Sequence, residues 1–441
     1  MLGRSSRVAR STACEARGAA GTRVEVAGWV HRVRTLGGVT FVILRDRTGL
    51  IQCVFERSPA AARLSCESVI AVKGLAVAEP RALSGVEVRA DDLEVIAPAP
   101  GVLPFEVNTK TLRANLDLQL QERALSLRHP MTQAVFRVQA ALARGFRRAL
   151  ETRGFLEVHT PKLVASGTEG GAELFPVRYF DRQAYLAQSP QFYKQMLVLS
   201  GFERVFEAGP VFRAENHNTT RHTNEFTSLD LEMAFIQSEE DVMVLHEQIL
   251  GEMLATVAGE CAAELDMLGA SLPESGPIPR LPVPEAHALL RERFGWTSPP
   301  GTSGVPEINA EGERLLGDYA RAELGSDLLF LTSFPTATRP AYTMPRADDP
   351  SLSRSFDLIF RGVEVTTGGQ RLNDYDALVR SFRARNYDPR DFESYLNPFR
   401  FGAPPHGGMA MGLERLTERL LGLGNIRQAT LFPRDRDRLT P

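Results

Sequence analysis

The stretch VFRAENHNTTRHTNEF, residues 211–226, combines two arginines, two histidines and two glutamates with threonines and asparagines. Apolar and charged residues alternate in its first part, which is the period of a β-strand. The following run EFTSLDLEMAF, residues 225–235, alternates in the same way. We therefore predict two antiparallel strands joined by the polar loop 216–224.

The expected hairpin has one apolar face and one charged face. The charged face carries Arg213, Glu215, Asp230 and Glu232. Such a face can simply be a solvated surface of an antiparallel sheet. Fixed arginines next to carboxylates and the aromatic Phe226 also suit a site that binds a polyphosphate and a zwitterion, because arginine binds phosphate oxygens bidentately.

The composition is that of an ordinary globular protein. The chain has 441 residues, 43% hydrophobic and 24% charged, with a net charge of −3. This length accommodates two or three domains. Its apolar runs are shorter than the roughly 20 residues that span a bilayer, so we expect no membrane association. Four cysteines lie far apart without a CxxC pair, which favours a reducing, cytoplasmic location.

The first part of the chain predicts a small β-barrel. Residues 1–19 are interpreted as an N-terminal extension, and residues 20–104 contain about five alternating strands, typical of an OB-type barrel. Such barrels bind single-stranded nucleic acid through aromatic and basic side chains, and Arg32, Phe41 and Gln52 are placed to do so. Alternation alone leaves open whether Phe41 belongs to the barrel core.

The rest of the chain, residues 129–441, is expected to form an α+β domain after a hinge at residues 105–128. The domain begins with a helix that ends at Gly154. We expect residues 356–371 to form a strand-like run before a Gly-Gly turn, and residues 407–422 to form a glycine-rich strand followed by an amphipathic helix. Residues 265–315, rich in proline and glycine, are interpreted as a small insertion to which the sequence assigns no function.

No Walker A motif and no GxGxxG after a strand is present, so the common nucleotide-binding loops do not explain these segments. Together the segments resemble motifs 1, 2 and 3 of class II aminoacyl-tRNA synthetases. The N-terminal barrel narrows the resemblance to the aspartyl/asparaginyl/lysyl subclass. The strings QSPQFYKQ, RGVEVTTGGQR and LFPRDRDRLTP are most similar to archaeal-type aspartyl-tRNA synthetases.

The resemblance implies a homodimer with an antiparallel catalytic sheet flanked by helices, and an anticodon-binding barrel. It also implies ATP and Mg²⁺, with Arg213, Arg415 and Glu364 as the catalytic residues. The implied ATP-binding residues are Arg213, Glu215, Arg221, His222, Phe226, Glu364 and Arg415, and the implied metal ligands are Asp357, Glu364 and Thr367. The implied aspartate-binding residues are Glu169, Gln191, Lys194, Asp230 and Arg371, and the implied anticodon-binding residues are His31, Arg32, Phe41, Gln52 and Pro80.

The resemblance further predicts which tRNAs are charged. His31 and Pro80 resemble the residues of enzymes that accept both tRNA(Asp) and tRNA(Asn), whereas strict enzymes have a bulkier aromatic and a lysine. We therefore predict a non-discriminating aspartyl-tRNA synthetase whose product on tRNA(Asn) goes to an amidotransferase. The alternatives are ordinary loop residues at these two positions, an asparaginyl-tRNA synthetase, a tRNA-independent asparagine synthetase, and a non-catalytic RNA-binding paralogue.

The two expected cations at residues 194 and 371 generate the first prediction. An aspartate side chain matches them in charge, whereas an asparagine amide leaves a cation unpaired in a desolvated site. Lys194→Ala is expected to lower aspartate-dependent ATP–pyrophosphate exchange by about 100-fold or more. Normal exchange by this variant would contradict the assignment.

Overall fold

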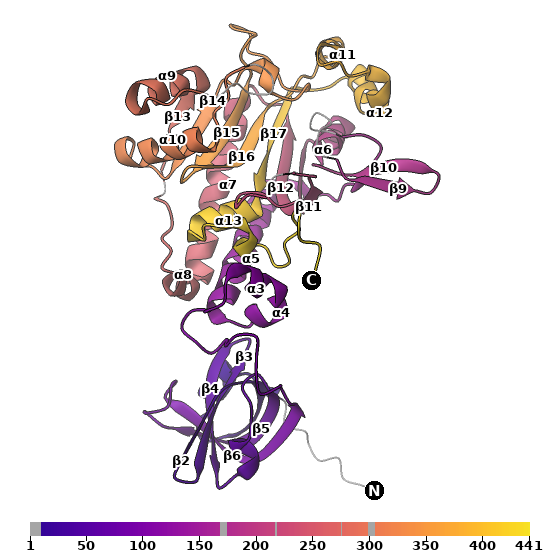
Figure 1. Cartoon of the computed structure of the whole chain (residues 1–441). Coiled ribbons are helices and arrows are strands. Elements are labelled where there is room, and N and C mark those ends of the chain that lie inside the picture. The colour runs from indigo at the N-terminus through magenta and orange to yellow at the C-terminus, as the bar shows by residue number, and fades with distance from the viewer. Residues whose placement is uncertain (1–9, 168–173, 217, 275, 299–304) are drawn as a thin grey trace. The chain divides into compact units, whose positions relative to one another are not determined.

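The computed structural model describes residues 10–167, 174–216, 218–274, 276–298 and 305–441. The chain divides into two compact units, Met1–His129 and Pro130–Pro441 (Figure 1). Each unit has its own buried apolar cluster. They are described separately below.

The first unit contains a closed β-barrel. Its strands are β2 (Arg23–Leu36), β3 (Val39–Asp46), β4 (Gly49–Glu56), β5 (Val69–Ala78) and β6 (Val86–Ala97). β2 pairs with both β3 and β5, and β4 pairs with β6, so the sheet closes on itself. Gly37 and Gly38 form the β2–β3 turn with φ of +58° and +84°, as a two-residue hairpin requires. The predicted OB-type barrel is confirmed.

Part of the expected extension at residues 1–19 belongs to this barrel. β1 (Arg10–Ser11) pairs with β2 in parallel, and α1 (Ala13–Arg17) begins with a capping box between Thr12 and Glu15. Ala13 and Ala16 are buried in the barrel core. The interpretation as an extension is therefore wrong from residue 10 onward, because two small apolar side chains fill the core beside β4.

Short helices complete the first unit. They are α2 (Pro59–Ala62), α3 (Leu116–Gln121) and α4 (Arg123–Ser126). The last two lie within residues 105–128, which were expected as a hinge. Phe105, Val107 and Leu120 are buried there, so this segment packs like the rest of its unit.

The second unit is built on an eight-stranded sheet of order β13-β14-β15-β16-β17-β12-β11-β7. The strands are β7 (Leu156–Glu157), β11 (Arg204–Phe212), β12 (Glu225–Ala234), β13 (Arg280–Pro282), β14 (Leu328–Thr332), β15 (Ser355–Phe360), β16 (Val363–Gln370) and β17 (His406–Gly412). All neighbours are antiparallel except the two edge pairs, β13–β14 and β11–β7. A smaller sheet contains β8 (Leu163–Val164), β9 (Pro176–Tyr179) and β10 (Arg182–Leu186).

Helices surround this sheet. They are α5 (Pro130–Glu151), α6 (Gln191–Leu197), α7 (Glu239–Glu260), α8 (Ala262–Leu268), α9 (Val283–Phe294), α10 (Ala310–Glu323), α11 (Tyr375–Ala384), α12 (Glu393–Leu396) and α13 (Leu413–Leu421). A π-helical turn covers Val198–Phe202, and 3₁₀ turns cover Thr336–Thr338, Pro389–Phe392, Asn397–Phe401 and Ile426–Ala429. The predicted end of the first helix is confirmed, because Gly154 has φ +76° just after it.

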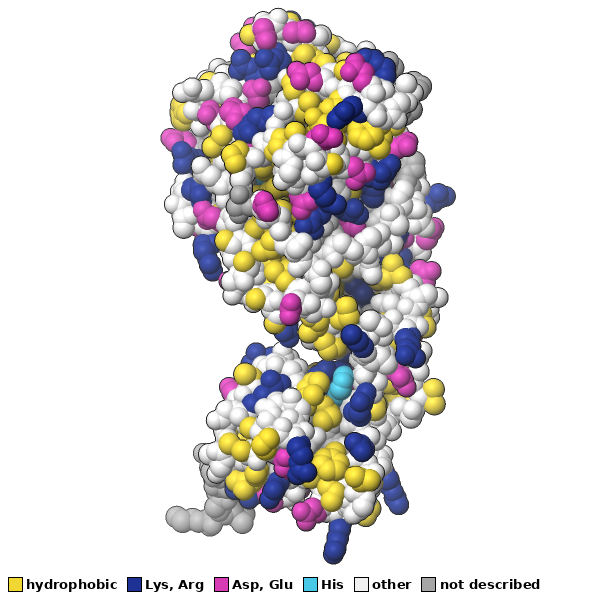
Figure 2. All heavy atoms as spheres, turned by 90° about the vertical axis from the view of Figure 1, so that its left-hand side faces the viewer, with side chains coloured by type: hydrophobic (Ala, Val, Ile, Leu, Met, Phe, Trp, Pro, Cys, Tyr) yellow, Lys and Arg dark blue, Asp and Glu magenta, His cyan; other side chains and the backbone are white. Residues whose placement is uncertain are grey.

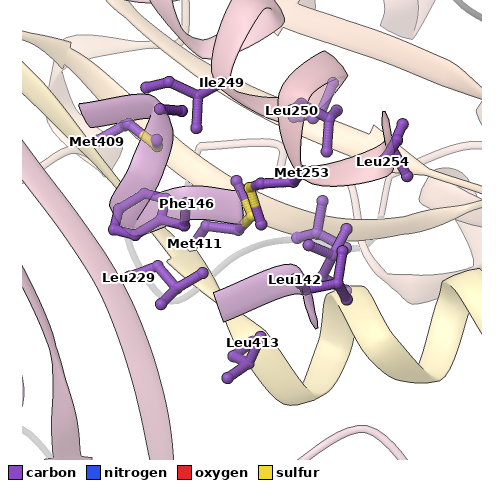
Figure 3. Close-up of a cluster of buried hydrophobic side chains, with 14 of the residues drawn as sticks. Leu142, Phe146, Leu229, Ile249, Leu250, Met253, Leu254, Met409, Met411 and Leu413 are labelled. Atoms are coloured by element: carbon purple, nitrogen blue, oxygen red, sulfur yellow. The ribbon is translucent and has the colours of Figure 1, made fainter. Parts of the chain in front are cut away.

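The core lies between the sheet and the helix pair α5 and α7. Phe146 of α5 and Met253 of α7 pack against Leu229 of β12 and Met411 of β17 (Figure 3). Leu229, Leu231 and Met233 all belong to this cluster, which confirms the predicted apolar face of the hairpin. The charged face of β12 must therefore point to the opposite side of the sheet.

One expectation about this unit, the Gly-Gly turn, is wrong. Gly368 and Gly369 lie inside β16, and the turn that follows β15 is Arg361-Gly362, with φ of +46° and +77°. A Cβ on Gly368 would lie 2.4 Å from the Phe356 ring, so close strand packing, rather than a turn, requires glycine there.

The segment that was expected to be an insertion, residues 265–315, packs against the sheet. It contributes β13 to the edge of the sheet and the whole of α9. Leu290 of α9 and Leu316 of α10 share a buried cluster with Leu329 and Leu331 of β14. The segment is therefore an integral layer over the sheet.

Candidate active site

Strand register brings the charged residues of the sheet together. Asp230 of β12 pairs with Ala410 of β17, which in turn pairs with Thr367 of β16. Thr367 pairs with Asp357 of β15. Residues paired across neighbouring strands share one face of a sheet, so these polar side chains lie on the face opposite the α5–α7 core.

A pocket of about 620 Å³ opens on this face, and we call it the hairpin pocket. Eight of the predicted site residues line it, namely Arg213, Glu215, Arg221, His222, Phe226, Glu364, Thr367 and Arg415. Ala410 and Gly412 of β17 form part of its wall. Their small side chains leave space above the sheet.

Arg213 and Phe226 face each other across the hairpin. The Arg213 guanidinium carbon lies 5.4 Å from the centre of the Phe226 ring. Asn224 fixes the hairpin end, since its side-chain amide donates to the backbone carbonyls of Arg213 at 2.7 Å and Glu215 at 3.2 Å. The Nε of Arg213 is buried and has no partner among the described residues, which leaves a donor for a ligand.

Arg415 lies in the first turn of α13 and reaches β16. Its Nη1 donates to the backbone carbonyl of Glu364 at 3.0 Å and lies 3.8 Å from that residue's carboxylate. The charge of this arginine is therefore held on the wall of the hairpin pocket, next to one of the expected metal ligands.

Asp357 has an unexpected cationic partner. Arg339 places Nη2 2.8 Å from Asp357 Oδ2 and stacks 3.6 Å from the centre of the Phe334 ring. Burial raises the pKa of Asp357, Arg339 opposes this, and the nearby Glu364 carboxylate raises it further, so that the pKa lies above its ordinary value. The other carboxylate oxygen, Oδ1, is buried without a partner within the described part of the chain.

The two expected aspartate-binding cations meet at one carboxylate. Lys194 Nζ lies 3.5 Å from Glu232 Oε2, and Arg371 Nε lies 3.0 Å from Glu232 Oε1. Lys194 also binds Asp230 at 3.0 Å. Side-chain exposure is at most 7% for all four residues, which we call the buried charge cluster. Burial raises the pKa of Glu232, but Arg371 and Lys194 outweigh it and hold that pKa below its ordinary value.

Glycine at 408 permits this arrangement. A Cβ there would lie 2.2 Å from Glu232 Oε2 and 2.1 Å from the backbone oxygen of Leu231. The Gly408 carbonyl accepts a hydrogen bond from Arg371 Nη2 at 3.0 Å. Gln191 is buried near the start of α6 with its Nε2 unpaired among described atoms, whereas Glu169 lies outside the described residues.

The barrel unit has a separate groove of about 2330 Å³. His31, Arg32, Phe41 and Gln52 line it, and Pro80 is exposed between the lining residues Glu79 and Arg81. Phe41 is absent from the barrel core, which decides the alternative left open by the sequence. Basic and apolar side chains are interspersed on the surface of this unit (Figure 2).

Hydrogen bonds to other barrel residues fix two of the groove residues, Gln52 and His31. Gln52 donates to Glu87 at 2.9 Å. Arg45, held by Glu67, donates to His31 Nδ1 at 3.1 Å, so this nitrogen is the acceptor. Burial and the Arg45 charge lower the pKa of His31 to about 4, and its ring is therefore neutral at pH 7.

Each of the two units matches a known protein family. Residues 115–436 match the family "tRNA synthetases class II (D, K and N)", and residues 24–96 match the family "OB-fold nucleic acid binding domain". The chain belongs to the class II tRNA synthetases of the D, K and N group. It is therefore an aminoacyl-tRNA ligase, and this family uses ATP as a substrate.

Known proteins are similar to this synthetase over nearly its whole length. A Thermus thermophilus protein named "Aspartate--tRNA(Asp/Asn) ligase" is 48% identical over 96% of this chain and 97% of its own. A Pyrococcus abyssi protein named "Aspartate--tRNA(Asp) ligase" is 43% identical, with the same coverage of both chains. The crystal structure of asparaginyl-tRNA synthetase from Pyrococcus horikoshii with asparaginyl-adenylate has a TM-score of 0.91 and 32% identity, covering 98% of this chain and 100% of that one.

The synthetase has site residues that the sequence prediction missed. Glu232 was placed on the charged face of the hairpin but given no role, although its period-two spacing from Asp230 was a signal. Arg339 lies in a loop whose sequence gives no periodic signal. Glu414 precedes the expected Arg415, and no pattern distinguished it from the other charged residues of an amphipathic helix.

Glu414 of α13 holds the backbone of β12 beside the hairpin pocket. It lines the hairpin pocket, is 6% exposed, and accepts the Thr227 backbone N–H at 3.0 and 3.1 Å. Burial raises the pKa of this carboxyl from 4.5 to about 7. Since Thr227 follows Phe226, the orientation of the aromatic ring depends on this contact.

The C-terminal segment fixes the hairpin loop. Arg427 binds Asp435 at 2.6 Å and donates to the Asn218 side chain at 2.6 Å. Asn218 in turn donates to Asp437 at 2.6 Å. The string LFPRDRDRLTP, residues 431–441, therefore holds the hairpin loop in place through Asp435 and Asp437.

The raised pKa of Glu414 generates a pH prediction. Between pH 4.5 and about 7 the folded chain keeps a proton that the unfolded chain loses, so rising pH destabilises the fold through this group. We expect the second unit of the wild type to lose on the order of 1–3 kcal/mol relative to Glu414→Gln between about pH 5 and pH 8. Urea unfolding at both pH values measures this difference, and parallel pH profiles for the two proteins would contradict the assignment.

Proposed function

We propose that this synthetase attaches aspartate to tRNA(Asp), and also to tRNA(Asn), through an aspartyl-adenylate. The observation that carries the proposal is the convergence of Lys194 and Arg371 on Glu232 in the buried charge cluster. The two cations already pair with Asp230 and Glu232, and a dicarboxylic amino acid offers a further carboxylate for them to bind. The names of the relatives support the same substrate.

Charge complementarity explains the choice of amino acid. Lys194 and Arg371 bind the side-chain carboxylate of aspartate, and Asp230, Gln191 and Glu169 bind its α-ammonium group. An asparagine amide offers these cations no charge, so they would remain bound only to Asp230 and Glu232, and the loss of the ion pair with the substrate supports discrimination of about 100-fold or more. A lysine side chain would be repelled by both cations.

Activation of aspartate takes place in the hairpin pocket. Phe226 stacks on adenine and Glu215 accepts a hydrogen bond from its amino group. Arg213 binds the α-phosphate, while Arg221, His222 and Arg415 bind the outer phosphates. The aspartate carboxylate attacks the α-phosphorus in line and pyrophosphate leaves. Catalysis consists of positioning and charge stabilisation. The 3′-hydroxyl of the terminal ribose then attacks the acyl carbon of the adenylate, which forms the ester and releases AMP.

The residues around Asp357 fit a magnesium ion. Asp357, Glu364 and Thr367 supply the hard oxygen ligands that Mg²⁺ prefers beside a triphosphate. The unpaired Asp357 Oδ1 and the mutual repulsion of the two carboxylates are what a bound cation would relieve. When bound, the ion would add positive charge beside the phosphates, and Arg339 would then share Asp357 with it.

Three other functions are the alternatives. An asparaginyl-tRNA synthetase is favoured by the similarity to the Pyrococcus horikoshii structure, but the cation at 194 opposes it. A tRNA-independent asparagine synthetase or a non-catalytic RNA-binding paralogue would not need both the barrel groove and the full set of pocket arginines.

We also propose a cytoplasmic homodimer. Among the described residues, no helix is both long and apolar enough to cross a bilayer. Cys14, Cys53, Cys66 and Cys261 are free thiols, which suits a reducing compartment.

Two exposed apolar side chains agree with the dimer that the family resemblance implies. Leu156 on the edge strand β7 is 49% exposed, and Phe180 between β9 and β10 is 79% exposed. Sedimentation of the wild type is expected to give the mass of two chains, and a monomeric mass at micromolar concentration would contradict the proposal.

Aspartylation of two transcripts tests the tRNA range. In the barrel groove, Phe41 stacks on an anticodon base and Gln52 reads the middle base, while His31 and Pro80 leave space for either third base. We expect charging of both tRNA(Asp) and tRNA(Asn), with the second product passing to an amidotransferase. Pro80→Lys is expected to lower charging of tRNA(Asn) alone, by about 10-fold. Charging of tRNA(Asp) only by the wild type would end the proposal.

A further inference from the structure

Glu313 connects the expected insertion to the hairpin pocket. It lies in the first turn of α10, and its Oε2 accepts hydrogen bonds from the Arg221 guanidinium and, at 3.1 Å, from the Glu364 backbone N–H. Arg221 and Glu364 both line the hairpin pocket, from the hairpin loop and from β16. One carboxylate therefore ties together two sides of the pocket.

The element that carries Glu313 is rigid. Asn309 caps α10 by accepting from the backbone N–H groups of Glu311 and Gly312. Gly317 packs against the β15–β16 turn so closely that a Cβ would lie 2.4 Å from the Gly362 nitrogen. Glu313 itself has a side-chain exposure of only 13%. Its carboxylate is thus held in place before any ligand binds.

Arg221 keeps donors available while it is bound to Glu313. Glu313 contacts Nη2, and the Nε of Arg221 is buried without a partner in the described part of the chain. Arginine presents five donors in a fixed planar fork, so it can bind a carboxylate and a phosphate oxygen at the same time. A lysine, with one point charge, cannot bridge two anions with the same geometry.

Charge pairing also favours this position of Arg221. The hairpin pocket is lined by Arg213 and Arg415 and by the carboxylates of Glu215, Glu364 and Glu414. Arg221 pairs instead with Glu313, which is not among the residues that line the pocket. This ion pair holds the Arg221 charge at the pocket wall and leaves the ligand space free.

We propose that Glu313 is a positioning residue for ATP, which holds the Arg221 fork against the pocket wall and aligns it with the strand that carries Glu364. The inference rests on the proposed role of Arg221 at the outer phosphates. It gives a function to residues 265–315 that their sequence did not indicate. Glu313 does not contact the reacting atoms and acts through Arg221.

Steady-state ATP–pyrophosphate exchange with aspartate tests the inference. Glu313→Gln is expected to raise KM for ATP by about 5–10-fold, because a charge-assisted hydrogen bond is lost, and to leave KM for aspartate unchanged. Glu311→Gln is the matched control, since it removes the same charge from an exposed position in the same helical turn. We expect it to behave as the wild type.

A second pair of variants separates positioning from a merely structural role. In an Arg221→Ala background, Glu313→Gln is expected to have no further effect on KM for ATP. Arg221→Lys, which keeps the charge but loses the fork, is expected to reproduce the rise in KM even if Glu313→Gln fails to fold. Thermal unfolding of each variant shows whether the fold is kept.

Three results would overturn the inference. They are an unchanged KM for ATP in folded Glu313→Gln, an equal effect of Glu313→Gln with and without Arg221, and a normal KM for ATP in Arg221→Lys. The proposed function has its own test: if the wild type shows no aspartate-dependent exchange, both the proposed function and this inference are rejected. Normal wild-type exchange together with a silent Glu313→Gln would reject the inference alone.

Discussion

The rest of the catalytic unit depends on the buried charge cluster at its centre. Lys194, Arg371, Asp230 and Glu232 carry two positive and two negative charges almost without contact with water. Burial of any one charge alone would cost several kcal/mol, so each must be paired by the fold itself. The pairing is possible because β12 and β17 are adjacent in register and residue 408 has no side chain. On the proposed function, we expect a small dicarboxylic acid to meet cations that are already oriented.

The hairpin pocket depends on the same strands. β12 carries Asp230 and Glu232 of the charge cluster and Phe226 of the hairpin pocket, and Arg371 directly follows β16, which also lines that pocket, so ATP and the amino acid are expected to lie side by side on one sheet face. Three segments distant in sequence support the pocket from outside. Glu414 holds the strand after Phe226, the C-terminal segment holds the loop through Arg427, and α10 holds Arg221 through Glu313. Rigid supports of this kind reduce the reorganisation that catalysis would otherwise require.

The sequence predicted local features well where a pattern is short and regular. The hairpin, the five-stranded barrel and the glycine-rich strand before α13 all follow from alternation and turn residues. The sequence-based prediction failed at Gly368, where glycine is needed for close packing and not for a turn. It also failed at Ala13 and Ala16, because two small apolar residues gave no pattern although they fill a core built by other strands. The edge strand β13 was missed because three residues give no detectable period.

By itself the sequence determined which residue types are present at the site, their order along the chain and the faces of the strands on which they lie. Alternation is a local property of the backbone and can be read without a structure. Only the tertiary structure decided the pairings: Lys194 with Arg371 across Glu232, Asp357 with Arg339, and Arg221 with Glu313. These contacts join residues that are 18 to 177 positions apart. Contacts between residues so far apart in the sequence are determined by strand register and helix packing, which no local pattern encodes.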